Sequence, residues 1–167
     1  MALKSKTTLQ TKRGIFEVGY YVVDGNPYVS FRYGDVSQGR PIVRLQSACL
    51  FGEAFGSLEC ECGAQLAKAL DAIVSRGAGL VLYAYAEGRG AGLEKKIEAM
   101  EIQRTTGCNT VEAFDSLGLE KSDYRDYQAE VNILTELGTS LHICLFSKNP
   151  ARYQALKDAG FDVDPYE

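Results

Sequence analysis

The sequence has no run of apolar residues long enough to cross a membrane. A transmembrane helix needs about 20 consecutive apolar residues, and the chain of 167 residues contains no such stretch. An apolar segment is also missing after the charged residues at the start, so the pattern of a secretory signal peptide is absent. We therefore expect a cytoplasmic protein that has no membrane partner.

Basic clusters are scarce as well. The chain has 18 lysine and arginine residues against 22 aspartate and glutamate residues, a net charge of −4. Its basic residues never form a run longer than a pair. Binding to nucleic acid regardless of sequence requires a basic footprint, so we expect no nucleic-acid partner. A small phosphorylated ligand remains open, because it needs only a few well-placed cations.

Internal repeats, low-complexity tracts and linkers are absent, which favours one domain over residues 1–167. The first third is rich in β-branched and aromatic residues divided by turn signals. Strands are predicted over 15–23, 28–33, 42–45, 79–86 and 141–146. Helical periodicity predicts helices over 62–76, 93–105, 127–137 and 150–159. These patterns indicate an α/β (or α+β) fold: a β-rich start, then strand–helix alternation around a mixed sheet.

Three of the five cysteines, Cys49, Cys60 and Cys62, lie close together in the sequence. Cytosolic thiols stay reduced, which favours a metal or catalytic role over disulfides. Thiolates suit zinc, which takes four protein ligands in structural sites and three plus water in catalytic sites. Cys62 opens a predicted helix, where free N–H groups favour the thiolate. The cluster therefore predicts a metal site.

Two other interpretations of the cysteines stay open from spacing alone. The thiols could be buried and behave as small hydrophobic groups, although Glu61 between two of them argues against a buried apolar strand. Alternatively, Cys108, Cys144 or His142 could supply a fourth ligand and close a structural zinc site.

The cysteine spacing is the first of five motifs that resemble the GTP cyclohydrolase II family, zinc enzymes that open the guanine imidazole ring at the start of riboflavin synthesis. The resemblance runs from about Arg44 to Asp162. The motifs are, in order, Cys49-x10-Cys60-x-Cys62-Gly-x-Gln65, Glu87-Gly-Arg89-Gly, Thr110-Val-Glu-Ala, Asp123-Tyr-Arg125-Asp and Ser147-Lys-Asn-Pro150.

The resemblance implies a metal centre and a reaction. Zn²⁺ would be held by Cys49, Cys60 and Cys62, with Mg²⁺ accompanying the triphosphate as a second candidate cofactor. The implied reaction is hydrolytic opening of the ring of GTP with release of pyrophosphate. Arg125 would be the nucleophile toward the α-phosphate and Asp123 its base. Because a guanidinium stays protonated, a plainer role is also open, in which Asp123 orients Arg125 as a fixed cation on the phosphates.

The resemblance also implies a nucleotide-binding set and a homodimer. The residues at positions that the family uses for the nucleotide are Arg44, Ser47, Gln65, Glu87, Gly88, Arg89, Thr110, Ser147 and Arg152. Of these, Glu87 could accept from N1–H and the 2-amino group of guanine, the edge that distinguishes it from adenine.

The sequence departs from the family pattern around the base. Gln46 and Ala48 replace a His and a Glu, Tyr85-Ala86 replaces Arg-Gln, and Met100 replaces a catalytic-helix Tyr. A thioether has no proton to give, so we expect a product that keeps its formyl group, a formamidopyrimidine nucleotide monophosphate. The alternative interpretation is that Met100 has no catalytic role and packs as a core residue beside Leu93 and Ile97.

Two further functions stay open from the sequence. One is a cyclohydrolase acting on a different purine nucleotide. The other is a non-catalytic nucleotide-binding homologue with a structural zinc, although the presence of both Asp123 and Arg125 favours an enzyme.

Overall fold

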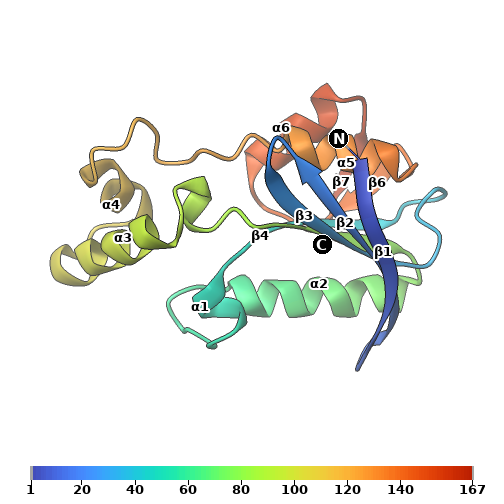
Figure 1. Cartoon of the computed structure of the whole chain (residues 1–167), viewed down its shortest axis with the longest axis horizontal. Helices are drawn as coiled ribbons and strands as arrows, with labels where there is room; N and C mark the ends of the chain where they lie inside the picture. The colour runs from blue at the N-terminus through green and yellow to red at the C-terminus, as the bar shows by residue number, and fades with distance from the viewer. Residues whose placement is uncertain (1, 167) are drawn as a thin grey trace.

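The fold is built on one mixed β-sheet, as the computed structural model, which describes residues 2–166, shows (Figure 1). The strands are β1 (Ala2–Thr11), β2 (Gly14–Val23), β3 (Asn26–Tyr33), β4 (Ile42–Ser47), β5 (Gly79–Ala84), β6 (His142–Leu145) and β7 (Asp162–Pro165). Their order across the sheet is β1-β2-β3-β5-β4-β6-β7. The β1–β2, β2–β3 and β3–β5 pairs are antiparallel, and the others are parallel. The predicted α/β class with a mixed sheet is confirmed.

Helices cover both faces of this sheet. They are α1 (Leu50–Glu53), α2 (Cys62–Arg76), the 3₁₀ turn η1 (Gly88–Gly90), α3 (Leu93–Thr106), α4 (Thr110–Ser116), α5 (Gln128–Glu136) and α6 (Pro150–Asp158). Helix α2 lies on one face and α5 and α6 on the other, whereas α3 and α4 form a lobe that stands away from the sheet (Figure 1). Within residues 2–166, no helix is long and apolar enough to cross a membrane.

The alternation of side chains along the strands explains the two main cores. Val43 and Leu80 point toward α5 and α6, whereas Ile42 and Val81 pack under α2 with Ile73, because successive strand residues face opposite sides. The lobe has a small core of its own, built around Ala99, Ala113 and Phe114. The lobe is therefore attached to the sheet through few buried contacts, and its position depends on the polar contacts described below.

All nine predicted elements are present, several with shifted ends. Helix α2 begins at Cys62, as predicted, and ends before Gly77, whose φ of 82° is left-handed. The helix predicted from Tyr127 begins one residue later, because Tyr127 itself has a left-handed φ of 64°. The strand predicted over 79–86 ends at Ala84, which leaves Tyr85 and Ala86 in the loop that follows.

Five elements were not predicted: β1, α1, the 3₁₀ turn η1, α4 and β7. Helix α4 carries a recognisable start signal, because Asn109 and Glu112 form a reciprocal capping box. Strand β1 is a sheet edge made largely of polar, exposed residues, so its sequence lacks the alternation that marks a half-buried strand.

Candidate active site

The three clustered cysteines come together at the carboxyl ends of two parallel strands. Ser47 at the end of β4 pairs with Ala84 at the end of β5. Cys49 follows β4, and Cys62 is the first residue of α2, which packs against both strands. Open α/β sheets commonly bind ligands at this edge. The sequence therefore brings the cysteines to the side of the sheet where a site is expected.

The three sulfur atoms fit one metal ion. All lie within 4.8 Å of one another, and Cys49 Sγ is 3.5 Å from Cys60 Sγ. Tetrahedral zinc with Zn–S bonds of about 2.3 Å separates its sulfur ligands by roughly 3.8 Å. Among the residues that the structure describes, these cysteines form the one group of three potential metal ligands.

None of the three candidates for a fourth protein ligand belongs to the sulfur group. Cys144 Sγ is 3.6 Å from the carbonyl oxygen of Pro165 in the core, and His142 pairs with Asp164 at 3.0 Å. Cys108 lines the same cavity as the cluster but is not part of the sulfur group. The arrangement therefore favours three thiolates with an open side toward the cavity.

Two glycines allow the cysteine loops to approach each other. A Cβ on Gly52 would lie 2.7 Å from Cys60 Sγ, and a Cβ on Gly63 would lie 2.2 Å from the carbonyl oxygen of Gly52. Both distances are too short for any side chain. The close packing of α1 on the start of α2, and with it the spacing of the sulfur atoms, thus requires glycine at both positions.

The cysteine thiols differ in their electrostatic surroundings. Burial acts to raise the pKa of Cys49, but hydrogen bonds from Lys96 and from the N–H of Gly52 outweigh it and lower the pKa. Burial and the neighbouring thiols raise the pKa of Cys62 to about 12. Metal binding to this group would therefore displace protons from at least one thiol, as is usual for cysteine sites.

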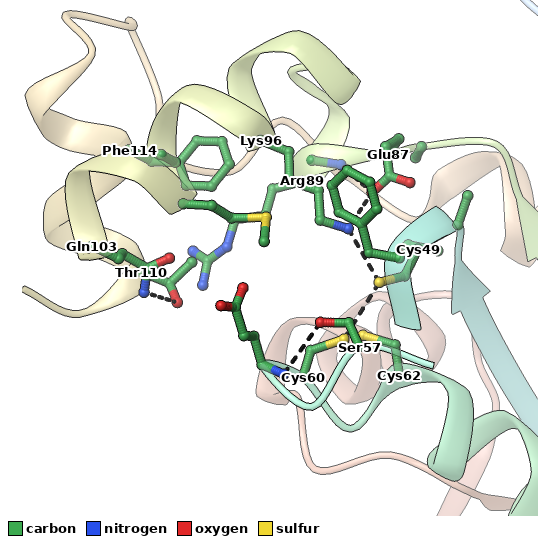
Figure 2. A pocket seen from close by; sticks show the side chains of 18 of the residues that line it. Cys49, Ser57, Cys60, Cys62, Glu87, Arg89, Lys96, Gln103, Thr110 and Phe114 are labelled. Carbon is green, nitrogen blue, oxygen red and sulfur yellow. Dashed lines mark hydrogen bonds and ion pairs between the residues drawn. The ribbon is translucent and has the colours of Figure 1, made fainter. Parts of the chain in front are cut away.

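A cavity of about 620 Å³ extends from the cysteines toward α3 and α4. This volume lies in the range of small-molecule sites. Figure 2 shows the cysteines at one end and Gln103, Thr110 and Phe114 at the other. Of the predicted site residues outside the metal group, those that line it are Ser47, Glu87, Gly88, Arg89, Met100, Thr110 and Arg125.

Arg125 is held in the cavity wall by Asp123. Its Nε is 2.8 Å from Asp123 Oδ1 and its Nη2 is 2.5 Å from Asp123 Oδ2, a two-pronged pair, and Nη1 is 3.4 Å from Ser47 Oγ. Burial acts to lower the pKa of Arg125, but the carboxylate outweighs it and raises the pKa. Burial acts to raise the pKa of Asp123, and the hydrogen bonds from Arg125 again prevail and lower it. The pair is therefore a fixed ion pair with a fully charged guanidinium.

Arg44 and Gln65 lie behind the segment 49–62 that carries the cysteines. They are not among the residues that line the cavity. Arg44 is 5% exposed and donates to Gln46 Oε1, Gln65 Oε1 and the carbonyl oxygen of Phe146 at 2.8–3.0 Å. Burial lowers the pKa of Arg44 to about 10. Gln46 continues the network to Glu53 at 2.7 Å. This buried network joins β4 to α1 and α2. In the structure Arg44 and Gln65 therefore support the segment 49–62, which carries the three cysteines.

Ser147 and Arg152 form a second group next to Arg125. Arg152 is 7% exposed, its Nη1 is 3.4 Å from Ser147 Oγ, and its Nε has no hydrogen-bond partner within the described chain. The guanidinium carbons of Arg152 and Arg125 lie 5.3 Å and 5.9 Å from the centre of the Tyr127 ring. Arg125, predicted as a cation on the phosphates, and Arg152, predicted to bind the nucleotide, are thus gathered around one tyrosine, and Arg125 also lines the cavity.

Glu87 already has partners in the structure. Its carboxylate accepts from the N–H groups of Leu50 and Gly88 and pairs with Lys96 at 2.8 Å. Its predicted role as an acceptor for the guanine edge would have to share the carboxylate with these groups, and it stays a prediction.

Met100 lies in the cavity wall, which argues against the interpretation of it as a core residue. Ile97, its supposed core neighbour, is 50% exposed, and neither residue belongs to the lobe core. Sequence reasoning did not identify Lys96 or Gln103, which occupy the same helix face at i−4 and i+3 from Met100 and line the same cavity. Helical spacing could have found both once Met100 was placed.

The fold and the site together define a class: an α/β protein whose candidate metal centre opens into a nucleotide-sized cavity lined by arginines. A model of the family described as GTP cyclohydrolase II matches residues 2–167. The chain belongs to the GTP cyclohydrolase II family.

Relatives agree with this assignment. The chain is 39% identical to a GTP cyclohydrolase-2 of Shewanella baltica over 98% of this chain and 81% of that protein. It is 40% identical to a GTP cyclohydrolase-2 of Neisseria meningitidis over 93% of this chain and 78% of that protein. It is also 42% identical to a riboflavin biosynthesis protein of Vibrio vulnificus, over 93% of this chain but only 42% of that longer protein.

A solved structure shares the fold. It is that of RibBX, a two-domain 3,4-dihydroxy-2-butanone 4-phosphate synthase from A. baumannii, with a TM-score of 0.55 and 17% sequence identity. The match covers 99% of this chain and 40% of that chain. At this identity the likeness shows the fold alone.

Proposed function

We propose that the protein hydrolytically opens the imidazole ring of GTP and releases pyrophosphate. The observation that carries the proposal is a single cavity lined both by the three-thiol group and by Arg125, in a chain of the GTP cyclohydrolase II family. The relatives named GTP cyclohydrolase-2 support the same reaction. Cytoplasmic location and a homodimer, both implied by the family, belong to the proposal.

Zinc is the metal of choice for this site, held by Cys49, Cys60 and Cys62. When bound it would supply an acidified water for hydrolysis at C8 of the purine. Mg²⁺ bound to the phosphates is a second candidate cofactor, because this ion is usually held by substrate phosphates.

Arg125 acts in this proposal as a cation on the α-phosphate. Its two-pronged pair with Asp123 fixes the guanidinium plane and keeps it charged, which suits stabilisation of phosphate charge. A nucleophilic role would require a neutral guanidine, and the raised pKa of Arg125 opposes that form. Arg152, whose guanidinium lies over the same tyrosine ring, and Ser147, which accepts a hydrogen bond from it, are proposed to bind the remaining phosphates.

Ultraviolet spectroscopy tests ring opening directly. Opening the imidazole ring changes the purine chromophore, whereas binding alone barely does. Zinc-loaded protein mixed with GTP should therefore convert the spectrum over time, with pyrophosphate released in parallel. An unchanged spectrum with clear GTP binding would instead support the non-catalytic homologue, and conversion of another purine nucleotide in preference to GTP would support the alternative substrate.

The product is proposed to keep its formyl group, on the strength of Met100 in the cavity wall. Expelling formate requires a second hydrolysis at the former C8, with a proton donated to a poor leaving nitrogen or an oxyanion held in place. A thioether offers neither. Loss of one positioned acid–base group typically costs about 10²–10⁴ in rate, so the formamidopyrimidine nucleotide monophosphate should accumulate.

Met100→Tyr is expected to gain formate release, because it restores a hydroxyl to the same cavity wall. Mass spectrometry of the product and a formate assay, at matched ring-opening rates, would measure the gain. The replacements at Gln46, Ala48 and Ala86 are expected to keep the rescue partial. Stoichiometric formate from the unmodified protein would contradict the proposed product while leaving ring opening intact.

A further inference from the structure

The ammonium group of Lys96 contacts a cysteine sulfur at the inner wall of the cavity. Its Nζ lies 3.1 Å from Cys49 Sγ and 2.8 Å from Glu87 Oε1 (Figure 2). It also lies 5.2 Å from the centre of the Phe51 ring. The side chains of Lys96 and Glu87 are only 17% and 15% exposed. Burying this lysine costs hydration and rotamer freedom, and favourable contacts of its ammonium group must offset that free energy.

Glu87 ties this lysine to the backbone next to the same cysteine. While one carboxylate oxygen pairs with Lys96, the other accepts from the N–H of Leu50 at 2.7 Å. Leu50 directly follows Cys49 and opens α1, where backbone N–H groups lack partners within the helix. Lys96 thus contacts the sulfur of Cys49, and Glu87 accepts a hydrogen bond from the peptide N–H that follows Cys49.

We propose that Lys96 and Glu87 are positioning residues of the metal centre, with Lys96 fixing and neutralising the Cys49 ligand and Glu87 holding Lys96 in place. Three thiolates on one divalent cation leave a net charge of −1, and an ammonium in contact with a sulfur offsets it. Hydrogen-bonded outer partners of this kind orient metal ligands and tune the metal. The inference rests on the proposed function only in that the three thiols bind zinc.

The contact also links the metal centre to the lobe. Lys96 lies on α3, whereas Cys49 follows β4, and α3 packs mainly on α4 and η1 rather than on the sheet. Met100 and Gln103 follow on the same face of α3 and line the cavity. The Lys96–Cys49 contact therefore sets the position of this cavity wall relative to the metal.

Zinc affinity of the purified protein tests the proposal without substrate. Competition with a chromophoric chelator would give dissociation constants for the unmodified protein, Lys96→Met, Glu87→Gln and the double variant. Methionine keeps the length of the lysine stem and removes the charge. Lys96→Met should weaken zinc binding by about 10–100-fold. Glu87→Gln should weaken it in the same direction. The double variant should resemble Lys96→Met, because glutamine can still accept from the N–H of Leu50 and the remaining effect of Glu87 acts through Lys96.

Lys95→Met is the matched control. Lys95 is the preceding residue and pairs with Glu98 on the surface of the lobe, so its removal should leave the zinc affinity unchanged. A cobalt-substituted sample adds a second readout, in which Lys96→Met should shift the sulfur-to-metal charge-transfer bands and Lys95→Met should not. Equal zinc affinity and equal cobalt spectra for the two variants would overturn the proposal.

The outcomes also separate this inference from the proposed function. Ring opening of GTP by the unmodified protein, together with normal zinc affinity in Lys96→Met, would defeat the positioning role alone. Weakened zinc binding in Lys96→Met, in a protein that leaves GTP intact, would support the positioning role and defeat the proposed reaction.

Discussion

Replacing Cys60 by serine is expected to abolish zinc binding and, with it, the ring opening of GTP. The Sγ atom of Cys60 lies 3.5 Å from that of Cys49 and completes the three-sulfur group. A serine hydroxyl does not ionise near neutral pH and is a harder ligand than a thiolate. The loss of affinity should exceed the roughly 10–100-fold typical of a change in the outer shell. Metal analysis after gel filtration and the ultraviolet assay with GTP would measure both effects.

Cys108→Ser is the informative comparison, because Cys108 lines the same cavity but lies outside the sulfur group. This variant should keep its zinc and its activity. His142→Ala should also keep its zinc and its activity, because the ring of His142 pairs with Asp164. If either change removed zinc as completely as Cys60→Ser, the site would have four protein ligands and a structural role, and the proposed hydrolysis would fail.

The sequence was informative where interactions are local. Helix α2 begins at Cys62 and ends before Gly77. Both ends could be predicted because the residues that signal them lie at the ends of the helix itself. The pairing of Asp123 with Arg125 spans only two positions, so a single turn of chain brings the groups together. Such features follow from backbone geometry and need no knowledge of the rest of the fold.

Contacts between distant segments could not be predicted in the same way. The link from Glu87 to Leu50 joins the loops after β5 and β4, and it exists only because these strands are parallel neighbours. The contact of Lys96 with Cys49 likewise depends on where the lobe settles against the sheet. Arg44 illustrates the same limit: its position in a strand was predicted, but its burial behind the segment 49–62 depends on α1 and α2.

Replacing Arg125 by alanine is expected to leave the fold and the zinc in place while pyrophosphate release falls on the order of 10³-fold, the cost typical of losing a phosphate-stabilising arginine. Arg125 lines the cavity, and its side-chain hydrogen bonds go to Asp123 and Ser47 rather than to the cysteines. The reason for the loss is electrostatic: without the guanidinium, the charge that develops on the α-phosphate loses the cation proposed to stabilise it. A coupled pyrophosphate assay beside metal analysis would separate catalysis from zinc binding.

Arg125→Lys and Asp123→Asn distinguish a cationic clamp from a nucleophile with its base. Lysine keeps the charge but loses the planar fork that meets Asp123 at two points, so a clamp should recover part of the activity lost in Arg125→Ala. Asparagine can still accept a hydrogen bond from Arg125 but cannot take a proton, so a clamp should tolerate Asp123→Asn far better than Arg125→Ala. Equal collapse of Asp123→Asn and Arg125→Ala would favour proton transfer by Asp123. Arg76→Ala, at the exposed end of α2, is the surface control. Normal pyrophosphate release by Arg125→Ala would exclude both roles for Arg125.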